Sequence, residues 1–169
     1  MPDKPYQRKG VSSNTQAGKD FEKKILCFLE DNNIIVQEQI QVPIGINSKK
    51  EHAFDIGNDS ILVECKSHTW TETGNTPSAK LKNWSEAMFI FYLTPTKYKK
   101  LFFVEMSYNQ NYCKTLLEYF IEHYSYLIPQ DVVLIDFYTK ENNYEVYIYD
   151  ITCKMHMRQD KTKLWDYLK

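Results

Sequence analysis

The stretch from Phe54 to His68 constrains this chain most, because it joins turn chemistry, an apolar strand and charged residues. It reads FDIGNDSILVECKSH, in which Gly-Asn-Asp-Ser is typical of a turn and Ile-Leu-Val-Glu-Cys-Lys of a buried strand. Charged side chains are costly to bury unless they are paired or bind an ion. We therefore take Asp55, Glu64 and Lys66 as candidate functional residues.

A hairpin with its turn at 57–60 places the three charged residues on one face. This turn pairs Asp55 with Leu62. Because paired residues share a face and side chains alternate along a strand, Asp55 lies on the face of Glu64 and Lys66. Asp55 and Glu64 are then diagonal neighbours, roughly 7–8 Å apart at the backbone. Two carboxylates at that spacing can converge on Mg²⁺, and a lysine beside them can orient a water or stabilise a phosphoryl oxygen.

The alternative interpretation is a solvated sheet face, on which Glu64 and Lys66 form an ordinary surface pair of little energetic value. The run up to Glu64 is apolar and lacks the alternation of polar residues that an exposed strand shows. The pattern therefore favours the functional interpretation.

The remaining segments predict one α/β (α+β) domain with a mixed central β-sheet flanked by helices. Helical periodicity covers 17–33, 77–94 and 113–127, and strand patterns cover 36–42, 53–56, 61–66, 101–106, 131–138 and 144–151. Thr76 is expected to cap the second helix, with Pro77 at its first position. Residues 1–15 lack periodicity and predict a flexible N-terminal arm, which leaves 16–169 as a single domain.

Composition excludes several classes of function. The net charge of −1 is unlike that of a strongly basic nucleic-acid-binding domain, so a DNA contact would need a local patch such as the lysines of 97–100. The four cysteines are too scattered for a zinc or redox motif. The chain shows no signal-peptide pattern, no bilayer-spanning stretch and no glycine-rich phosphate loop. We expect a soluble cytoplasmic protein with no membrane partner and no organic cofactor.

The arrangement Asp55…Glu64-Cys65-Lys66 resembles the signature of the PD-(D/E)XK nuclease superfamily. A proline usually precedes the first acid in that superfamily, whereas Phe54 does so here. The resemblance covers about residues 16 to 106 and implies a restriction-endonuclease-like core. It also implies a metal-dependent DNA endonuclease that hydrolyses phosphodiester bonds and works as a homodimer, because two DNA strands need two sites.

The resemblance further implies a role for each site residue. Asp55, Glu64 and the backbone carbonyl of Cys65 would hold Mg²⁺, for which Mn²⁺ could substitute. Lys66 would act on the attacking water. Glu22 matches a further acid on the first helix of the family, although an ordinary surface acid explains this residue equally well.

Four residues are candidates for DNA contact. Lys80, Lys82 and Asn83 lie on the helix after the catalytic strand, where the family often places basic or polar residues. His68 is expected to contact DNA or simply to be exposed. Trp70 could stack on a base or cover the core, and both interpretations stay open.

Two alternatives to a restriction-type enzyme also stay open. One is a DNA junction-resolving or repair nuclease of the same fold, and the other is a non-catalytic DNA-binding or assembly module. Cleavage of linear, supercoiled and branched DNA would separate the three.

Overall fold

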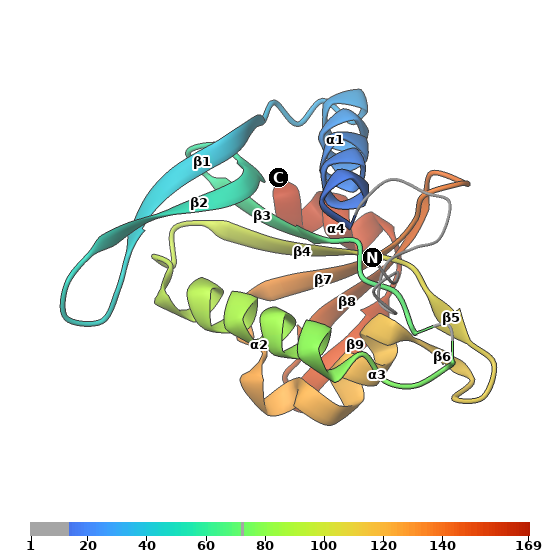
Figure 1. Ribbon diagram of the computed structural model, residues 1–169. Helices are drawn as coiled ribbons and strands as arrows, with labels where there is room; N and C mark the ends of the chain where they lie inside the picture. The colour runs from blue at the N-terminus through green and yellow to red at the C-terminus, as the bar shows by residue number, and fades with distance from the viewer. Residues whose placement is uncertain (1–13, 72) are drawn as a thin grey trace, which may run out of the picture.

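The computed structural model describes residues 14–71 and 73–169. Within these residues, seven strands form a mixed sheet in the order β1-β2-β3-β4-β7-β8-β9, as Figure 1 shows. In chain order the elements are α1 (Asn14–Asp31), β1 (Gln37–Ile44), β2 (Lys50–Gly57), β3 (Ile61–Lys66), α2 (Ser78–Leu93), β4 (Lys99–Glu105), β5 (Tyr108–Asn109), β6 (Lys114–Thr115), α3 (Leu116–Tyr124), the 3-10 helix η1 (Ser125–Leu127), β7 (Val132–Tyr138), β8 (Asn143–Asp150), β9 (Met155–Gln159) and α4 (Thr162–Leu168). The predicted single α+β domain with a mixed sheet is confirmed.

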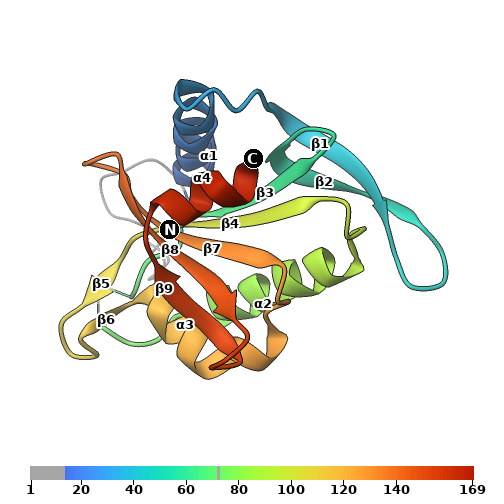
Figure 2. The same cartoon turned by 180° about the vertical axis from the view of Figure 1, so that it is seen from behind.

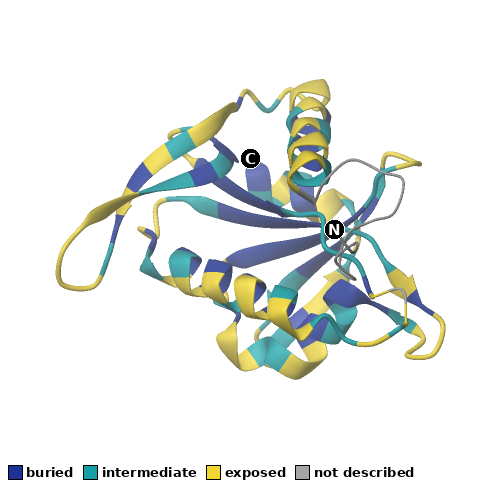
Figure 3. Ribbon diagram, viewed as in Figure 1, coloured by how far each residue is buried: buried dark blue, intermediate teal, exposed yellow. Residues whose placement is uncertain are grey.

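Helices cover both faces of the sheet. α1 and α4 pack on one face and α2 and α3 on the other, as the two opposite views show (Figures 1 and 2). The central strands β3, β4 and β7 are parallel to one another and buried on both sides (Figure 3). This explains why their sequences are nearly continuous apolar runs, since parallel strands covered by helices have no solvent-facing side.

Several element boundaries differ from the predictions for local reasons. β2 begins at Lys50 because its first residues pair with β1 along the whole hairpin. The expected Thr76 cap on α2 is wrong, since Pro77 itself is the N-cap residue and no side chain caps the helix. α3 begins at Leu116, three residues later than predicted, because Thr115 and Glu118 form a reciprocal capping box there.

Three segments were missing from the prediction. The short β5–β6 hairpin has two residues per strand, which is too few for a periodic pattern. β9 and α4 follow the last predicted strand, and α4 packs its Leu164 and Leu168 against the α1 side of the sheet. The predicted arm at residues 1–15 falls mostly outside the described residues, and its last two residues belong to α1.

The β2–β3 hairpin has a register different from the predicted one. Gly57 pairs with Leu62, whereas the prediction paired Leu62 with Asp55. Asn58 sets the turn, since its Oδ1 accepts the backbone N–H groups of the residues two and three positions later, at 2.8 and 2.9 Å. The observed register, continued beyond the last backbone pair, brings Asp55 opposite Glu64, so the two acids are closer to direct than to diagonal neighbours.

Candidate active site

Asp55 lies where β2 and β3 stop pairing through their backbones. The neighbours of Asp55 on β2, Phe54 and Ile56, are buried on opposite faces of the sheet, so the strand twists at this residue. The Asp55 Oδ2 accepts the backbone N–H of Cys65 at 2.8 Å. The Asp55 carboxylate therefore lies between the two strands and takes a backbone donor that β3 would otherwise offer to β2.

Glu64 is the most buried acid of the site, with only 5% of its surface exposed. Its Oε2 accepts a hydrogen bond from the Lys66 Nζ at 2.6 Å, and its Oε1 lies 3.3 Å from the His52 Nε2. Burial alone would raise the pKa of Glu64, but the hydrogen bonds and charges of His52 and Lys66 outweigh it and lower the pKa. Glu64 is thus held as a carboxylate.

The pKa of Asp55 is shifted in the opposite direction to that of Glu64. Burial, and next the negative charge of Glu64, raise the pKa of Asp55 to about 7, although Lys66 and the Cys65 N–H oppose the rise. Two neighbouring carboxylates that are shielded from solvent resist being ionised together. The pair therefore holds a proton near neutral pH that a bound cation would displace.

Lys66 supplies the positive charge among these acids. Burial would lower the pKa of its ammonium group, but the carboxylates of Glu64 and Asp55 outweigh this effect and raise it. Glu22 on α1 belongs to the same electrostatic group. Its pKa is raised, chiefly by burial and further by Glu64, while Lys66 opposes the rise. The structure thus places Asp55, Glu64 and Lys66 at the end of the β2–β3 pairing, with Glu22 within range of their charges, and of these four residues Glu64 and Lys66 line a pocket beside α2.

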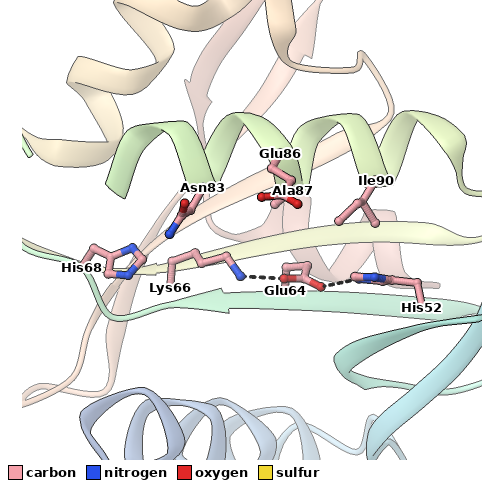
Figure 4. A pocket seen from close by; sticks show the side chains of 8 residues that line it. All are labelled: His52, Glu64, Lys66, His68, Asn83, Glu86, Ala87 and Ile90. Atoms are coloured by element: carbon pink, nitrogen blue, oxygen red, sulfur yellow. Dashed lines mark hydrogen bonds and ion pairs between the residues drawn. The ribbon is translucent and has the colours of Figure 1, made fainter. Parts of the chain in front are cut away.

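This pocket has a volume of about 310 Å³ and opens between α2 and the part of the sheet that carries Glu64 and Lys66. Figure 4 shows Lys66, Glu64 and His52 in a row along its floor, with His68 at one end and α2 above. The residues that line it are His52, Glu64, Lys66, His68, Asn83, Glu86, Ala87 and Ile90. Sequence reasoning missed His52 and Glu86. The signal for His52 was its place just before the predicted strand 53–56, which is in fact part of β2.

The four predicted DNA contacts divide into two pairs. His68 and Asn83 line the pocket beside Lys66. The His68 Nδ1 accepts a hydrogen bond from the buried Trp84 Nε1 at 2.9 Å, so His68 is tethered to the core on one side. Lys80 and Lys82 lie on the first turns of α2 and are not among the residues that line the pocket.

The lysine patch at 97–100 does not form the expected surface strip. Lys100 is 2% exposed, and its Nζ forms an ion pair with Asp131 at 2.6 Å. The patch also lies at the wrong end of the sheet, because Lys99 pairs with Ile61 at the start of β3, whereas Lys66 ends that strand. Trp70 covers the core: it is 8% exposed and stacks on Tyr112 with a ring-centroid distance of 4.9 Å.

Comparisons with protein-family models, with curated proteins and with solved structures give no match. No group of three or more His, Cys, Asp or Glu side chains arranged to hold a metal occurs within 14–71 and 73–169. Over the same residues, no helix is long and apolar enough to cross a membrane. The function of this protein is therefore inferred from the geometry of the site.

Proposed function

We propose that this protein is a metal-dependent DNA endonuclease of the PD-(D/E)XK type, most similar in plan to restriction endonucleases. The observation that carries the proposal is the convergence of Asp55, Glu64 and Lys66 where β2 and β3 stop pairing, with Glu22 close enough to influence their charges. A strongly perturbed carboxyl pKa, here that of Asp55, close to a half-buried lysine and a pocket is typical of catalytic sites.

The order of elements supports the same proposal. The helix α1 comes first, the antiparallel strands β1, β2 and β3 follow, and α2 leads to β4, which is parallel to β3. The helix before the β2–β3 hairpin and the helix after β3 agree with the resemblance, which places one helix before the signature and another after the catalytic strand. The strands β7, β8 and β9 extend the sheet beyond it, and β5 and β6 form a separate two-stranded sheet.

The donor set fits Mg²⁺. Asp55 and Glu64 offer oxygen ligands, the backbone carbonyl of Cys65 is a third candidate, and Mg²⁺ usually keeps several waters beside one or two carboxylates. Mn²⁺ could substitute, because it accepts the same ligands. When bound, the ion would supply a more acidic water and neutralise charge on the phosphate.

Lys66 has a separate task in this proposal. Its ammonium is now held by the Glu64 Oε2 at 2.6 Å. If Glu64 held a cation, Lys66 would be free to orient the attacking water or to stabilise the charge that develops on the phosphoryl oxygen. Glu22 would assist as an additional acid near the same water.

DNA would reach the site along the open side of the pocket. His68 and Asn83 could contact the backbone beside the scissile phosphate, and Lys80 and Lys82 could bind phosphates farther along α2. A homodimer would provide one site for each strand. A junction-resolving or repair nuclease would use the same residues. The kind of DNA that is cleaved would distinguish it from a restriction-type enzyme.

The test is incubation of the pure protein with linear, supercoiled and branched DNA, in Mg²⁺ and in EDTA. We expect Mg²⁺-dependent cleavage that Asp55→Asn and Glu64→Gln abolish while both variants stay folded. Glu51→Gln is the control, since Glu51 is an exposed acid on β2 that does not line the pocket. Binding without cleavage by the wild type would favour the non-catalytic module, and full activity in either acid variant would refute the site.

Lys66→Ala should lower the single-turnover rate by about 10²–10³ while DNA affinity measured in Ca²⁺ changes little. Lys66→Arg should rescue only partly, because the guanidinium is planar, bulkier and does not lose its proton. An unchanged rate with weaker DNA binding would instead make Lys66 a phosphate contact.

A further inference from the structure

His52 is a polar residue that the proposed reaction does not yet use. Its Nε2 lies 3.3 Å from the Glu64 Oε1, on the side of the carboxylate opposite to Lys66 (Figure 4). The side chain is 28% exposed and lines the pocket. An ionised carboxylate can only accept a hydrogen bond, so the His52 Nε2 carries the hydrogen and donates it.

The orientation of the His52 ring is fixed by the core and not by solvent. The ring meets Phe54 edge-on, with a centroid distance of 4.8 Å and an angle of 81° between the planes. Phe54 is fully buried and stacks on Phe91 of α2 at 5.7 Å. Across the β1–β2 pair, His52 lies opposite Val42 of β1, which is also buried. The imidazole therefore packs against Phe54 of its own strand, and α2 supports Phe54 in turn through Phe91.

We propose that His52 is a positioning residue for Glu64, which orients this carboxylate toward the cation and keeps it in place when Lys66 leaves it. This inference rests on the proposed nuclease function. The Glu64 carboxylate has two hydrogen-bond partners in the pocket, Lys66 and His52. If Lys66 turns to the substrate, His52 is the partner that remains on Oε1 and fixes the direction of Oε2.

A hydrogen-bond donor behind a metal-binding carboxylate acts on metal affinity more than on the chemical step. Removal of such outer partners typically costs about 10–100-fold in metal affinity or activity. A histidine that only filled space would leave the metal requirement unchanged. The Mg²⁺ dependence of the rate thus distinguishes positioning from packing.

The experiment compares His52→Leu, His52→Gln and His52→Asn with the wild type. Leucine keeps the apolar contact with Phe54 but has no donor. The glutamine Nε2 reaches about as far as the imidazole Nε2, whereas the asparagine amide is too short. His123→Leu is the control, because His123 is exposed on α3 and does not line the pocket.

We expect the Mg²⁺ concentration for half-maximal single-turnover cleavage to rise about 10–100-fold in His52→Leu and His52→Asn. His52→Gln should be close to the wild type, and His123→Leu should match it. If His52→Leu does not fold, the comparison of the two amides decides, since both are polar and of similar volume. Titration with Mn²⁺ in the absence of DNA should show the same ranking.

The unfavourable results are of two kinds: those that overturn only the role of His52, and one that also overturns the proposed nuclease function. A wild-type protein that binds Mn²⁺ and cleaves DNA, beside a folded His52→Leu with the same Mg²⁺ requirement, overturns only the role of His52. Equal weakening in the glutamine and asparagine variants also overturns it, because reach would then not matter. A wild-type protein that neither binds Mn²⁺ nor cleaves DNA overturns the proposed nuclease and this role with it.

Discussion

Asp136 on β7 should make the stability of this protein fall as the pH rises from about 4 to about 7. Its side chain is 1% exposed, and neither carboxylate oxygen has a hydrogen-bond partner among the described residues. Burial raises the pKa of Asp136 to about 7, with the Thr115 hydroxyl opposing and the charges of Glu118 and Glu145 adding to the rise. The native state therefore holds the proton that the unfolded chain releases near pH 4.

The size of the effect follows from the two pKa values. The folded value of about 7 against a reference of 3.8 is a difference of roughly three units. At about 1.4 kcal/mol per unit this sets an upper limit of about 4 kcal/mol, and we expect ~2–4 kcal/mol. Between these two pKa values the folded state binds more protons than the unfolded state. The contribution of Asp136 to the free energy of unfolding therefore decreases from about pH 4 to about pH 7 and is constant above that.

Asp136→Asn isolates this contribution, because the amide has the same shape and never ionises. The assay is urea unfolding of both proteins at several pH values, and the quantity is the difference between their free energies of unfolding. We expect a small difference near pH 4 and a variant that is ~2–4 kcal/mol more stable near pH 8. Asp59→Asn is the control, since Asp59 is exposed in the β2–β3 turn. A difference that stays constant with pH, or that favours the wild type at high pH, would refute the reasoning.

Three further outcomes are expected. Because the pKa of Asp55 is about 7, Mg²⁺ affinity should fall by up to about tenfold per pH unit below that value, and calorimetry in two buffers should detect proton release at binding. Gly45→Ala should lower the melting temperature, because Gly45 has a φ of +147° and an added Cβ would lie 1.9 Å from the Ser48 carbonyl oxygen. Gly18→Ala should instead stabilise the protein by about 0.5–1 kcal/mol, since the site lies within α1 and the nearest contact of a Cβ is 3.9 Å away, and the same thermal scan checks it.

The sequence predicted the central elements because their signals are local. The apolar run of β3 and the stripe Phe21, Ile25, Phe28 and Leu29 of α1 each report the face they bury without reference to the rest of the chain. The register of the β2–β3 hairpin depended on which residues form the turn, and the Asn58 side chain decides this through bonds that composition does not reveal. A strong turn signal located the hairpin but left its register ambiguous by two residues.

The candidate site was predictable to the extent that it lies on one hairpin. Asp55, Glu64 and Lys66 are close in sequence, so one β-pairing brings them together. His52 and Glu86 reach the same pocket through the twist of β2 and the packing of α2, which no local pattern encodes. The same limit explains Lys100, which the sequence placed in a local lysine patch for DNA contact but which is buried and paired with Asp131.

Asp55 and Asp136 show why a perturbed pKa does not identify a functional acid by itself. Burial raises the pKa of both to about 7. Asp136 has Leu134 and Phe137 beside it in two core clusters and no hydrogen-bond partner among the described residues, so its neutral form is the stable one. At Asp55, the negative charge of Glu64 opposes ionisation, whereas Lys66 and the backbone N–H of Cys65 favour it. A cation that binds between the two strands would lower the pKa of Asp55 further. Around Asp136, by contrast, the Thr115 hydroxyl favours the charged form but does not outweigh burial.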